Sequence, residues 1–323
     1  MDKKLRLGHL PIWLGSLLLA LMGTLSACGK QEIPVLHTTI SADGQIVATL
    51  LHAGTDKQQL RVRNLGTANS WHTLQAPPLT QSIRFGLQGH ELLLTHRRPT
   101  PPKFTYLSKL DLDQPDKAPQ RIYEAYELAF PVEVSPGQVL VRTGDSHQQE
   151  TFSTGVYWIV VGPEKQIQKV GPESMPYAAP NIVGSGFFWM EDQIGINDEA
   201  HPKLHQFAFP GGKAPDIPAE TFEKNTFNVI CDRRADRCLR QYITNLRKGE
   251  PFIYDVEVML GSERCQVRGV AGISDDVSIT PDGKASVMSL ASAYGNPRHV
   301  VVMQFRSNQC EAISVQHFNF EEK

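Results

Sequence analysis

The sequence predicts an all-β fold, and two observations support this prediction. After about residue 33, no long segment shows the 3.6-residue apolar period of an amphipathic helix. The chain instead has short runs rich in Val, Ile, Phe, Tyr and Thr, which Gly, Pro, Asp and Asn separate. These runs include 46–51, 91–95, 139–142, 156–161 and 300–305. Such runs are typical of β-strands that are joined by tight turns.

A hairpin pattern also recurs along the chain. Residues 39–49 read Thr-Ile-Ser-Ala-Asp-Gly-Gln-Ile-Val-Ala-Thr, and residues 278–288 read Ser-Ile-Thr-Pro-Asp-Gly-Lys-Ala-Ser-Val-Met. A shortened copy with a Pro-Gly turn occupies residues 133–141. From these hairpins the chain divides into six units, each of about 40–48 residues and each with room for four strands. The units are 36–76, 80–124, 127–171, 176–219, 222–269 and 274–318.

The hairpins resemble the Ser/Thr-x-Asp-Gly-Lys/Gln blade motif of TolB-type propellers, which are also called WD40-like β-propeller repeats. The resemblance covers three of the six units and implies a single β-propeller of about six four-stranded blades. The repeat length also allows seven blades, and the alternative fold is a pair of two-sheet β-sandwiches. The propeller fold hosts binding modules and enzymes alike, so it implies little about function.

The N-terminus has the pattern of an export signal. Lys3, Lys4 and Arg6 precede the uncharged, mostly apolar stretch 10–25, which is shorter than a stable membrane span requires. The stretch ends in Leu25-Ser26-Ala27-Cys28. This tetrapeptide resembles the lipobox of bacterial lipoproteins at every position.

The lipobox resemblance implies that residues 1–27 are a signal peptide that is removed in the mature chain. Cys28 would then carry diacylglycerol on its sulfur and an N-acyl chain, and these lipids are the only cofactor that we expect. Residue Gly29 resembles the second residue of lipoproteins sorted to the outer membrane. We therefore expect a periplasmic protein that is anchored to the outer membrane, with the inner membrane and the cell surface as alternatives. Residues 28–34 would be a short linker, and residues 35–320 the propeller domain.

The charge balance excludes one class of partner. The whole chain has a formal net charge of −2. Loss of Lys3, Lys4, Arg6 and Asp2 with the signal peptide makes the charge of the mature chain more negative. Nucleic-acid binding requires a basic surface that neutralises phosphates, so we expect no nucleic-acid partner.

Four cysteines remain once Cys28 is assigned to the lipid. An even number of cysteines in an exported chain predicts disulfides, because the periplasm is oxidising. Four cysteines allow three pairings, and the hairpin-like spacing favours Cys231–Cys238 together with Cys265–Cys310. A zinc site is disfavoured, because the chain has no Cys-x₂-Cys pair, and we expect no bound metal.

Long connections between the second and third strands of the units are the candidate ligand site. Loops on a rigid scaffold commonly carry function, and these loops would surround one mouth of the ring. Their His and Asp side chains could form a metal or general-base site, or could simply be solvated. The candidate residues at this mouth are His96, His147, Asp145, Asp198, His201 and His299.

Motifs for nucleophilic or phosphate chemistry are missing, and no catalytic residue can be assigned. The sequence has no Gly-x-Ser-x-Gly elbow, Walker loop or GxGxxG motif. The leading hypothesis is therefore a lipid-anchored, protein-binding scaffold module of the cell envelope, and the missing motifs favour binding over catalysis. The alternative hypothesis is a periplasmic enzyme, or a binder of glycans or peptides, that uses the loop mouth.

Overall fold

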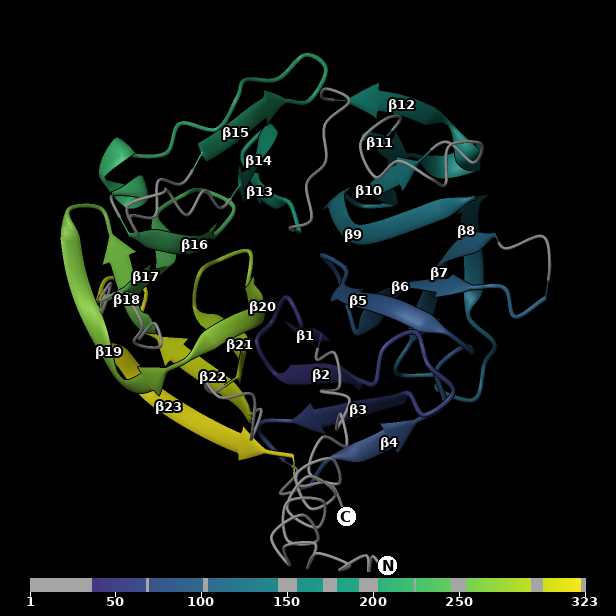
Figure 1. Cartoon of the computed structure of the whole chain (residues 1–323), viewed down its shortest axis with the longest axis horizontal. Helices are drawn as coiled ribbons and strands as arrows, with labels where there is room; N and C mark the ends of the chain where they lie inside the picture. The colour runs from purple at the N-terminus through teal and green to yellow at the C-terminus, as the bar shows by residue number, and fades with distance from the viewer. Residues whose placement is uncertain are drawn as a thin grey trace, which may run out of the picture. The chain divides into compact units, whose positions relative to one another are not determined.

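The computed structural model describes residues 37–67, 70–100, 104–144, 156–170, 179–191, 203–223, 225–244, 254–291 and 299–320. These residues form 23 strands, two short 3₁₀ helices and six antiparallel sheets. The sheets are arranged as blades around a central axis (Figure 1). The predicted all-β propeller with six blades is therefore confirmed, and the β-sandwich alternative is wrong.

The first three blades follow one another along the chain, and each has four strands. Blade 1 comprises β1 (His37–Ile40), β2 (Ile46–Leu51), β3 (Gln59–Asn64) and β4 (His72–Leu74). Blade 2 comprises β5 (Thr80–Phe85), β6 (Glu91–Arg97), β7 (Thr105–Asp111) and β8 (Gln120–Ala125). Blade 3 comprises β9 (Glu127–Ser135), β10 (Gln138–Gly144), β11 (Val156–Val161) and β12 (Ile167–Val170), with the 3₁₀ helix η1 (Pro163–Lys165) before its last strand.

The last three blades continue this order. Blade 4 comprises β13 (Asn181–Val183), β14 (Gly186–Glu191) and β15 (Lys203–Ala208), and the 3₁₀ helix η2 (Ala219–Phe222) follows it. Blade 5 comprises β16 (Thr226–Cys231), β17 (Arg237–Ile243), β18 (Tyr254–Leu260) and β19 (Glu263–Ala271). Blade 6 comprises β20 (Ile273–Ile279), β21 (Ala285–Ala291), β22 (His299–Phe305) and β23 (Ala312–Asn319).

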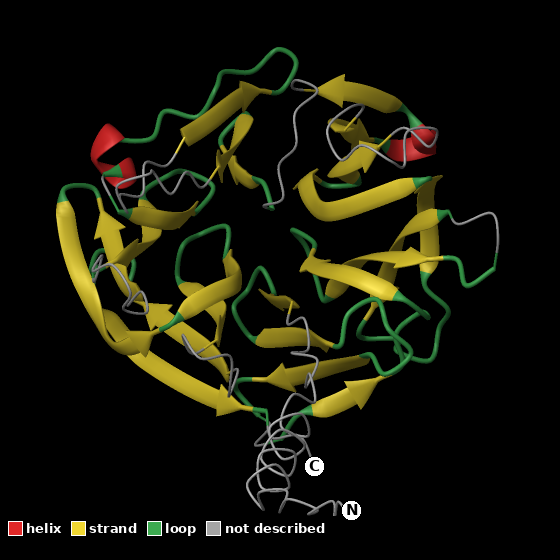
Figure 2. Ribbon diagram, in the orientation of Figure 1, coloured by secondary structure: helices red, strands yellow, loops and turns green. Residues whose placement is uncertain are grey.

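Each blade places its first strand next to the axis and its later strands progressively outward (Figure 2). The second strands are mostly buried on both faces, because each packs against the blades before and after it. Every residue of β2 is buried, as are Phe187 and Phe188 of β14. This burial explains why the sequence shows continuous apolar runs where a half-exposed strand would alternate. The run Phe187–Met190 therefore lies in the second strand of blade 4, one strand out from the axis.

Blade 4 differs from the predicted four-stranded unit, because the described residues give it three strands. The segment after β15 contains Pro210, Pro215 and Pro218, and proline cannot donate a hydrogen bond to a strand ladder. This segment instead packs against the turn between β13 and β14, where Phe209 N–H donates to the Ser185 carbonyl over 2.9 Å. Gly212 allows this close approach, since a Cβ atom there would lie 2.5 Å from the Ser185 carbonyl oxygen.

Side-chain packing joins blade 1 to blade 6 and closes the ring. Each of these two sheets takes all its described strands from one end of the chain, so no strand is exchanged between them. Val47 and Leu51 of blade 1 form a buried cluster with Val287 and Val300 of blade 6. At the periphery, the ring of Trp71 lies 5.8 Å from that of Phe318 and 5.2 Å from that of Phe320.

The structure contains the two disulfides that the spacing favours. Cys231 at the end of β16 is bonded to Cys238 at the start of β17, within blade 5. Cys265 of β19 is bonded to Cys310, which precedes β23, so this second bridge joins blade 5 to blade 6. Among the described residues, no helix has the length and apolar character that a membrane span needs.

Candidate functional site: the central channel and the A–B face

The first strands of the blades line a central channel that contains two cavities. The strand-start cavity, of about 120 Å³, lies where these strands begin and is lined by His37, Phe130 and Asp276, among others. The turn-side cavity, of about 70 Å³, lies where the strands end and is lined by Arg233, among others. Arg84 lines both cavities, so its side chain lies between them.

The strand-start cavity has a charged wall and an apolar wall. The charged wall carries His37 of blade 1, Arg84 of blade 2 and Asp276 of blade 6. The apolar wall comes from blades 3, 4 and 5 and includes Phe130, Pro131, Ala179, Pro180 and Val229. A cavity with polar groups on one side and apolar groups on the other has the character of a small-molecule site.

Arg84 reaches across the first strand of blade 1 to blade 6. Its Nη1 donates to the Val277 carbonyl over 3.0 Å, and its Nη2 lies 3.9 Å from Asp276 Oδ1. The Asp276 carboxylate also accepts hydrogen bonds from the N–H groups of Thr38 and Val277, and His37 Nδ1 lies 3.4 Å from it. Three blades are therefore joined at the charged wall.

Arg233 makes a similar link at the other end of the channel. It lies in the turn between β16 and β17 of blade 5, and its guanidinium donates to the backbone carbonyls of Glu133 and Val134 in blade 3. Its backbone carbonyl accepts from Gly184 N–H of blade 4, and its N–H donates to the Pro281 carbonyl of blade 6. Burial lowers the pKa of Arg233 to about 10, so the group remains charged at neutral pH.

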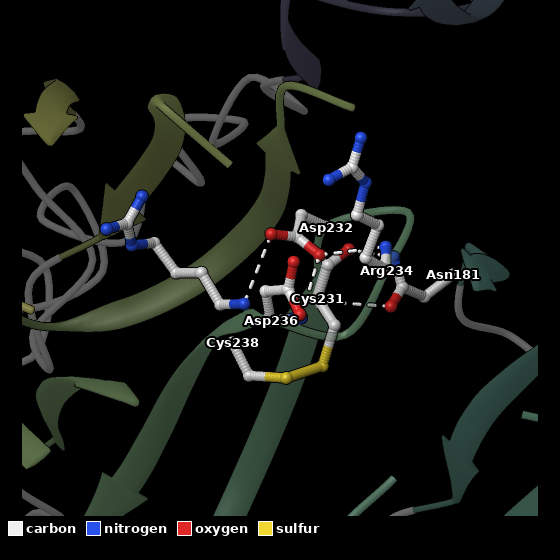
Figure 3. Close-up of a disulfide and its surroundings, with 7 residues drawn as sticks. Asn181, Cys231, Asp232, Arg234, Asp236 and Cys238 are labelled. Atoms are coloured by element: carbon white, nitrogen blue, oxygen red, sulfur yellow. Dashed lines mark hydrogen bonds between the residues drawn. A yellow bond between two sulfur atoms is a disulfide. The ribbon is translucent and has the colours of Figure 1, made fainter. Parts of the chain in front are cut away.

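The turn that carries Arg233 is itself rigid (Figure 3). The Asp232 carboxylate accepts hydrogen bonds from the N–H groups of Arg234, Asp236 and Arg237, and the Cys231–Cys238 bridge closes the base of the turn. Figure 3 also shows the Asn181 amide against Cys231, where it bonds to both backbone polar groups of that residue. Burial raises the pKa of Asp232, and the three backbone N–H groups offset part of this effect.

The turns between the first and second strands form one connected surface, which we call the A–B face. It comprises residues 41–45, 86–90, 135–138, 184–185, 232–236 and 280–284. Blade 1 meets blade 2 through Asp43 and His90, which lie 3.6 Å apart, and Leu87 N–H of blade 2 donates to the Glu133 carboxylate of blade 3 over 2.5 Å. Arg233 connects blades 3, 4, 5 and 6, and a Cβ atom at Gly44 would lie 3.1 Å from Ala285 of blade 6.

Hydrogen bonds between neighbouring residues at the rim of the A–B face stabilise the charged forms of His90 and Asp43. The hydrogen bond with Asp113 raises the pKa of His90, and Asp43 adds to this effect. Burial tends to raise the pKa of Asp43, but hydrogen bonds from Ser41, Gln45 N–H and His90 outweigh it and lower the pKa. The face is therefore preorganised and polar.

Of the six loop-mouth residues predicted from the sequence, the structure describes two, and it does not bring these two together at the channel cavities. His147, Asp145, Asp198 and His201 lie outside the described residues. His96 lies in blade 2 and His299 in blade 6, and neither lines the two channel cavities. Within the described part of the chain, no three His, Cys, Asp or Glu side chains are grouped so that they could hold a metal ion.

The side chain of His96 packs within blade 2 and contacts residues of the neighbouring strand. Its Nε2 lies 2.9 Å from Ser108 Oγ, and its ring packs 5.3 Å from that of Tyr106. Burial, and then the charge of Arg121, lowers the pKa of His96 to about 4. Sequence reasoning missed Arg84, His37 and Asp276, because they are far apart in the chain and match no motif.

Comparison with known proteins supports the fold. No protein-family profile and no curated sequence matches the chain. The solved structure of TolB from Acinetobacter baumannii is 12% identical, with a TM-score of 0.57, over 94% of this chain and 68% of that chain. The acylaminoacyl peptidase of Pyrococcus horikoshii is 12% identical, with a TM-score of 0.52, over 91% of this chain and 47% of that chain. This chain thus spans about half the length of the peptidase. At these identities the likeness establishes a TolB-like propeller fold.

Proposed function

We propose that this protein is a lipid-anchored periplasmic propeller that binds another protein of the cell envelope through its A–B face. The observation that supports binding most directly is the connection of all six A–B turns into one rigid surface. A preorganised surface loses little conformational entropy when a partner binds, so more of the contact energy appears as affinity.

Two features support the proposed location. The tetrapeptide Leu25-Ser26-Ala27-Cys28 directly follows an apolar stretch with a basic start, and this region lies outside the described residues. The two disulfides fit an oxidising compartment such as the periplasm. A diacylglyceryl group and an N-acyl chain would together bury enough CH₂ groups for stable anchoring, where a single chain binds only marginally.

The anchor is tested by metabolic labelling with a palmitate analogue, with and without globomycin. We expect the wild-type chain to take up label and to fractionate with outer membranes. The variant Cys28→Ala should take up no label, and globomycin should cause the unprocessed precursor to accumulate. An unlabelled wild-type chain would contradict the proposed anchor.

Protein binding is tested by site-specific photo-crosslinking in intact cells. The crosslinking residue is placed at Gln88, Arg234 or Lys284, whose side chains are exposed on the A–B face. Matched controls carry it at Lys57, in the connection between β2 and β3, or at Glu124, at the end of β8; both are exposed and lie at the opposite ends of the strands.

We expect a discrete adduct from the A–B positions and none from the two controls. Mass spectrometry of the adduct would identify the partner. Recovery of only the monomer from every A–B position would refute the proposed protein binding. It would leave the result of the labelling experiment unaffected.

A further inference from the structure

We propose that the strand-start cavity is a binding site for a carboxylate that carries a small apolar group. The proposal concerns a site inside the channel and does not depend on protein binding at the A–B face. The carboxylate could belong to a free aliphatic acid or to the C-terminus of a peptide, and the experiment below distinguishes these two sources.

The first argument is the state of Arg84. Its side chain is 11% exposed and lines both cavities. A guanidinium has five N–H donors, and the described residues accept one hydrogen bond from Arg84, at the Val277 carbonyl. The contact of Nη2 with Asp276 is 3.9 Å, which is too long for a hydrogen bond. A buried guanidinium with unused donors is suited to the paired oxygens of a carboxylate.

The second argument is the state of Asp276. Its carboxylate is held by the N–H groups of Thr38 and Val277 and lies close to His37. These contacts hold Asp276 at the wall, and its Oδ1 lies 3.9 Å from Arg84 Nη2, which is beyond hydrogen-bond distance. Asp276 therefore lowers the cost of burying Arg84 while its charge opposes an incoming anion.

The third argument is the apolar wall that faces Arg84. It includes Phe130, whose φ of 53° lies in the left-handed region that a bulky residue rarely adopts. Residues held in such strained conformations are concentrated at functional sites. The guanidinium of Arg142 lies 5.3 Å from the centre of the Phe130 ring and helps to hold it. The cavity of about 120 Å³ approaches the size of cavities that hold a benzene-sized group.

The test is a titration of the purified full-length chain with 4-methylpentanoate, its uncharged analogue 4-methylpentanamide, and the peptide N-acetyl-glycyl-leucine. Affinity is measured by calorimetry, and the site by methyl NMR of isoleucine. Among the δ1-methyl signals, that of Ile83 should move, because Ile83 lines this cavity and does not line the turn-side cavity. Those of Ile167 and Ile313 should not, because they are exposed on the outer strands β12 and β23.

Two variants test whether the charged wall binds the carboxylate, and a third, on the outer surface, is the control. Arg84→Met should weaken binding of the acid at least tenfold, since a hydrogen bond to a charged group corresponds to about that factor. Asp276→Asn should tighten binding, because it removes the opposing charge and keeps an oxygen that can accept from Thr38. Arg268→Met, at an exposed site on β19, should leave the affinity unchanged.

The opposite signs expected for Arg84→Met and Asp276→Asn separate recognition from a general loss of folding. Tighter binding of the acid than of the peptide would identify a small acid as the ligand, and the reverse would identify a chain end. The proposal is overturned if the amide binds as tightly as the acid, if neither carboxylate binds, or if Asp276→Asn weakens binding.

Discussion

Arg233 and Glu133 lie on blades that are not neighbours, and the guanidinium of Arg233 donates a hydrogen bond to the backbone carbonyl of Glu133. Arg84 makes the corresponding link from blade 2 to blade 6 near the other end of the channel. The two arginines therefore connect blades that are not adjacent in the ring. Neither carbonyl acceptor of Arg233 carries a formal charge, so the arginine acts as a hydrogen-bonding brace.

The brace predicts a specific loss of stability. Arg233→Met should lower the free energy of unfolding by about 2 kcal/mol, because the carbonyls of Glu133 and Val134 would lose their donor in a mostly buried site. Urea denaturation monitored by tryptophan fluorescence measures the change. The neighbouring Arg234→Met serves as the control, because Arg234 is exposed and should be close to neutral. Equal effects of the two substitutions would contradict the bracing role.

The two disulfides should contribute unequally to stability. In the chain-entropy description, the stabilisation grows with the length of the loop that a bridge closes. The sequence separations of 45 for Cys265–Cys310 and 7 for Cys231–Cys238 correspond to about 4 and about 2.5 kcal/mol. Paired Cys→Ala variants, compared by urea denaturation under oxidising conditions, should lose stability in that order. The reverse order would show that local strain or packing outweighs chain entropy.

The low pKa of His96 predicts an acid-sensitive contribution to stability. The pKa is about 4 in the folded chain and is near 6.5 in an unfolded one, so the folded state binds fewer protons between these values. Stability from this group is present above pH 6.5 and is lost as the pH falls toward 4. After allowance for solvent screening, the loss should be about 2 kcal/mol.

The variant His96→Gln tests this pH dependence. It should flatten the wild-type decline in the free energy of unfolding between pH 6.5 and pH 4, measured by urea denaturation at several pH values. A variant curve parallel to that of the wild type would show that His96 does not cause the acid sensitivity. His72→Gln is a suitable control, because His72 is an exposed histidine on β4.

Ring closure should depend on Trp71. Its indole packs on Phe318 and Phe320, where blade 1 meets blade 6 and the described strands show no exchange between the two sheets. Trp71→Ala should destabilise the propeller by about 2–3 kcal/mol, and Trp71→Phe by much less, because a smaller ring still fills part of the space. Hydrogen exchange should show faster opening in β1 and β23 than in β9 and β10. Uniform exchange across the blades would contradict a local role.

Much of the fold could be predicted from local sequence signals. The apolar runs and the Asp-Gly and Pro-Gly turns placed the six units close to the blades, because strand propensity and turn geometry are properties of short segments. Blade 4 has three strands among the described residues, and this difference also has a local cause, in Pro210, Pro215 and Pro218. The repeat length of about 40–48 residues alone did not reveal this smaller number of strands.

Residue type and spacing are enough to predict the tight turns, the even number of cysteines after Cys28 and the all-β class. Which side chains meet in the channel depends instead on how the blades come together in three dimensions. His37, Arg84 and Asp276 belong to three blades and come together because ring closure brings blade 6 against blade 1. That closure depends on packing between residues more than 200 positions apart, such as Val47 and Val300, and no local pattern encodes such a contact.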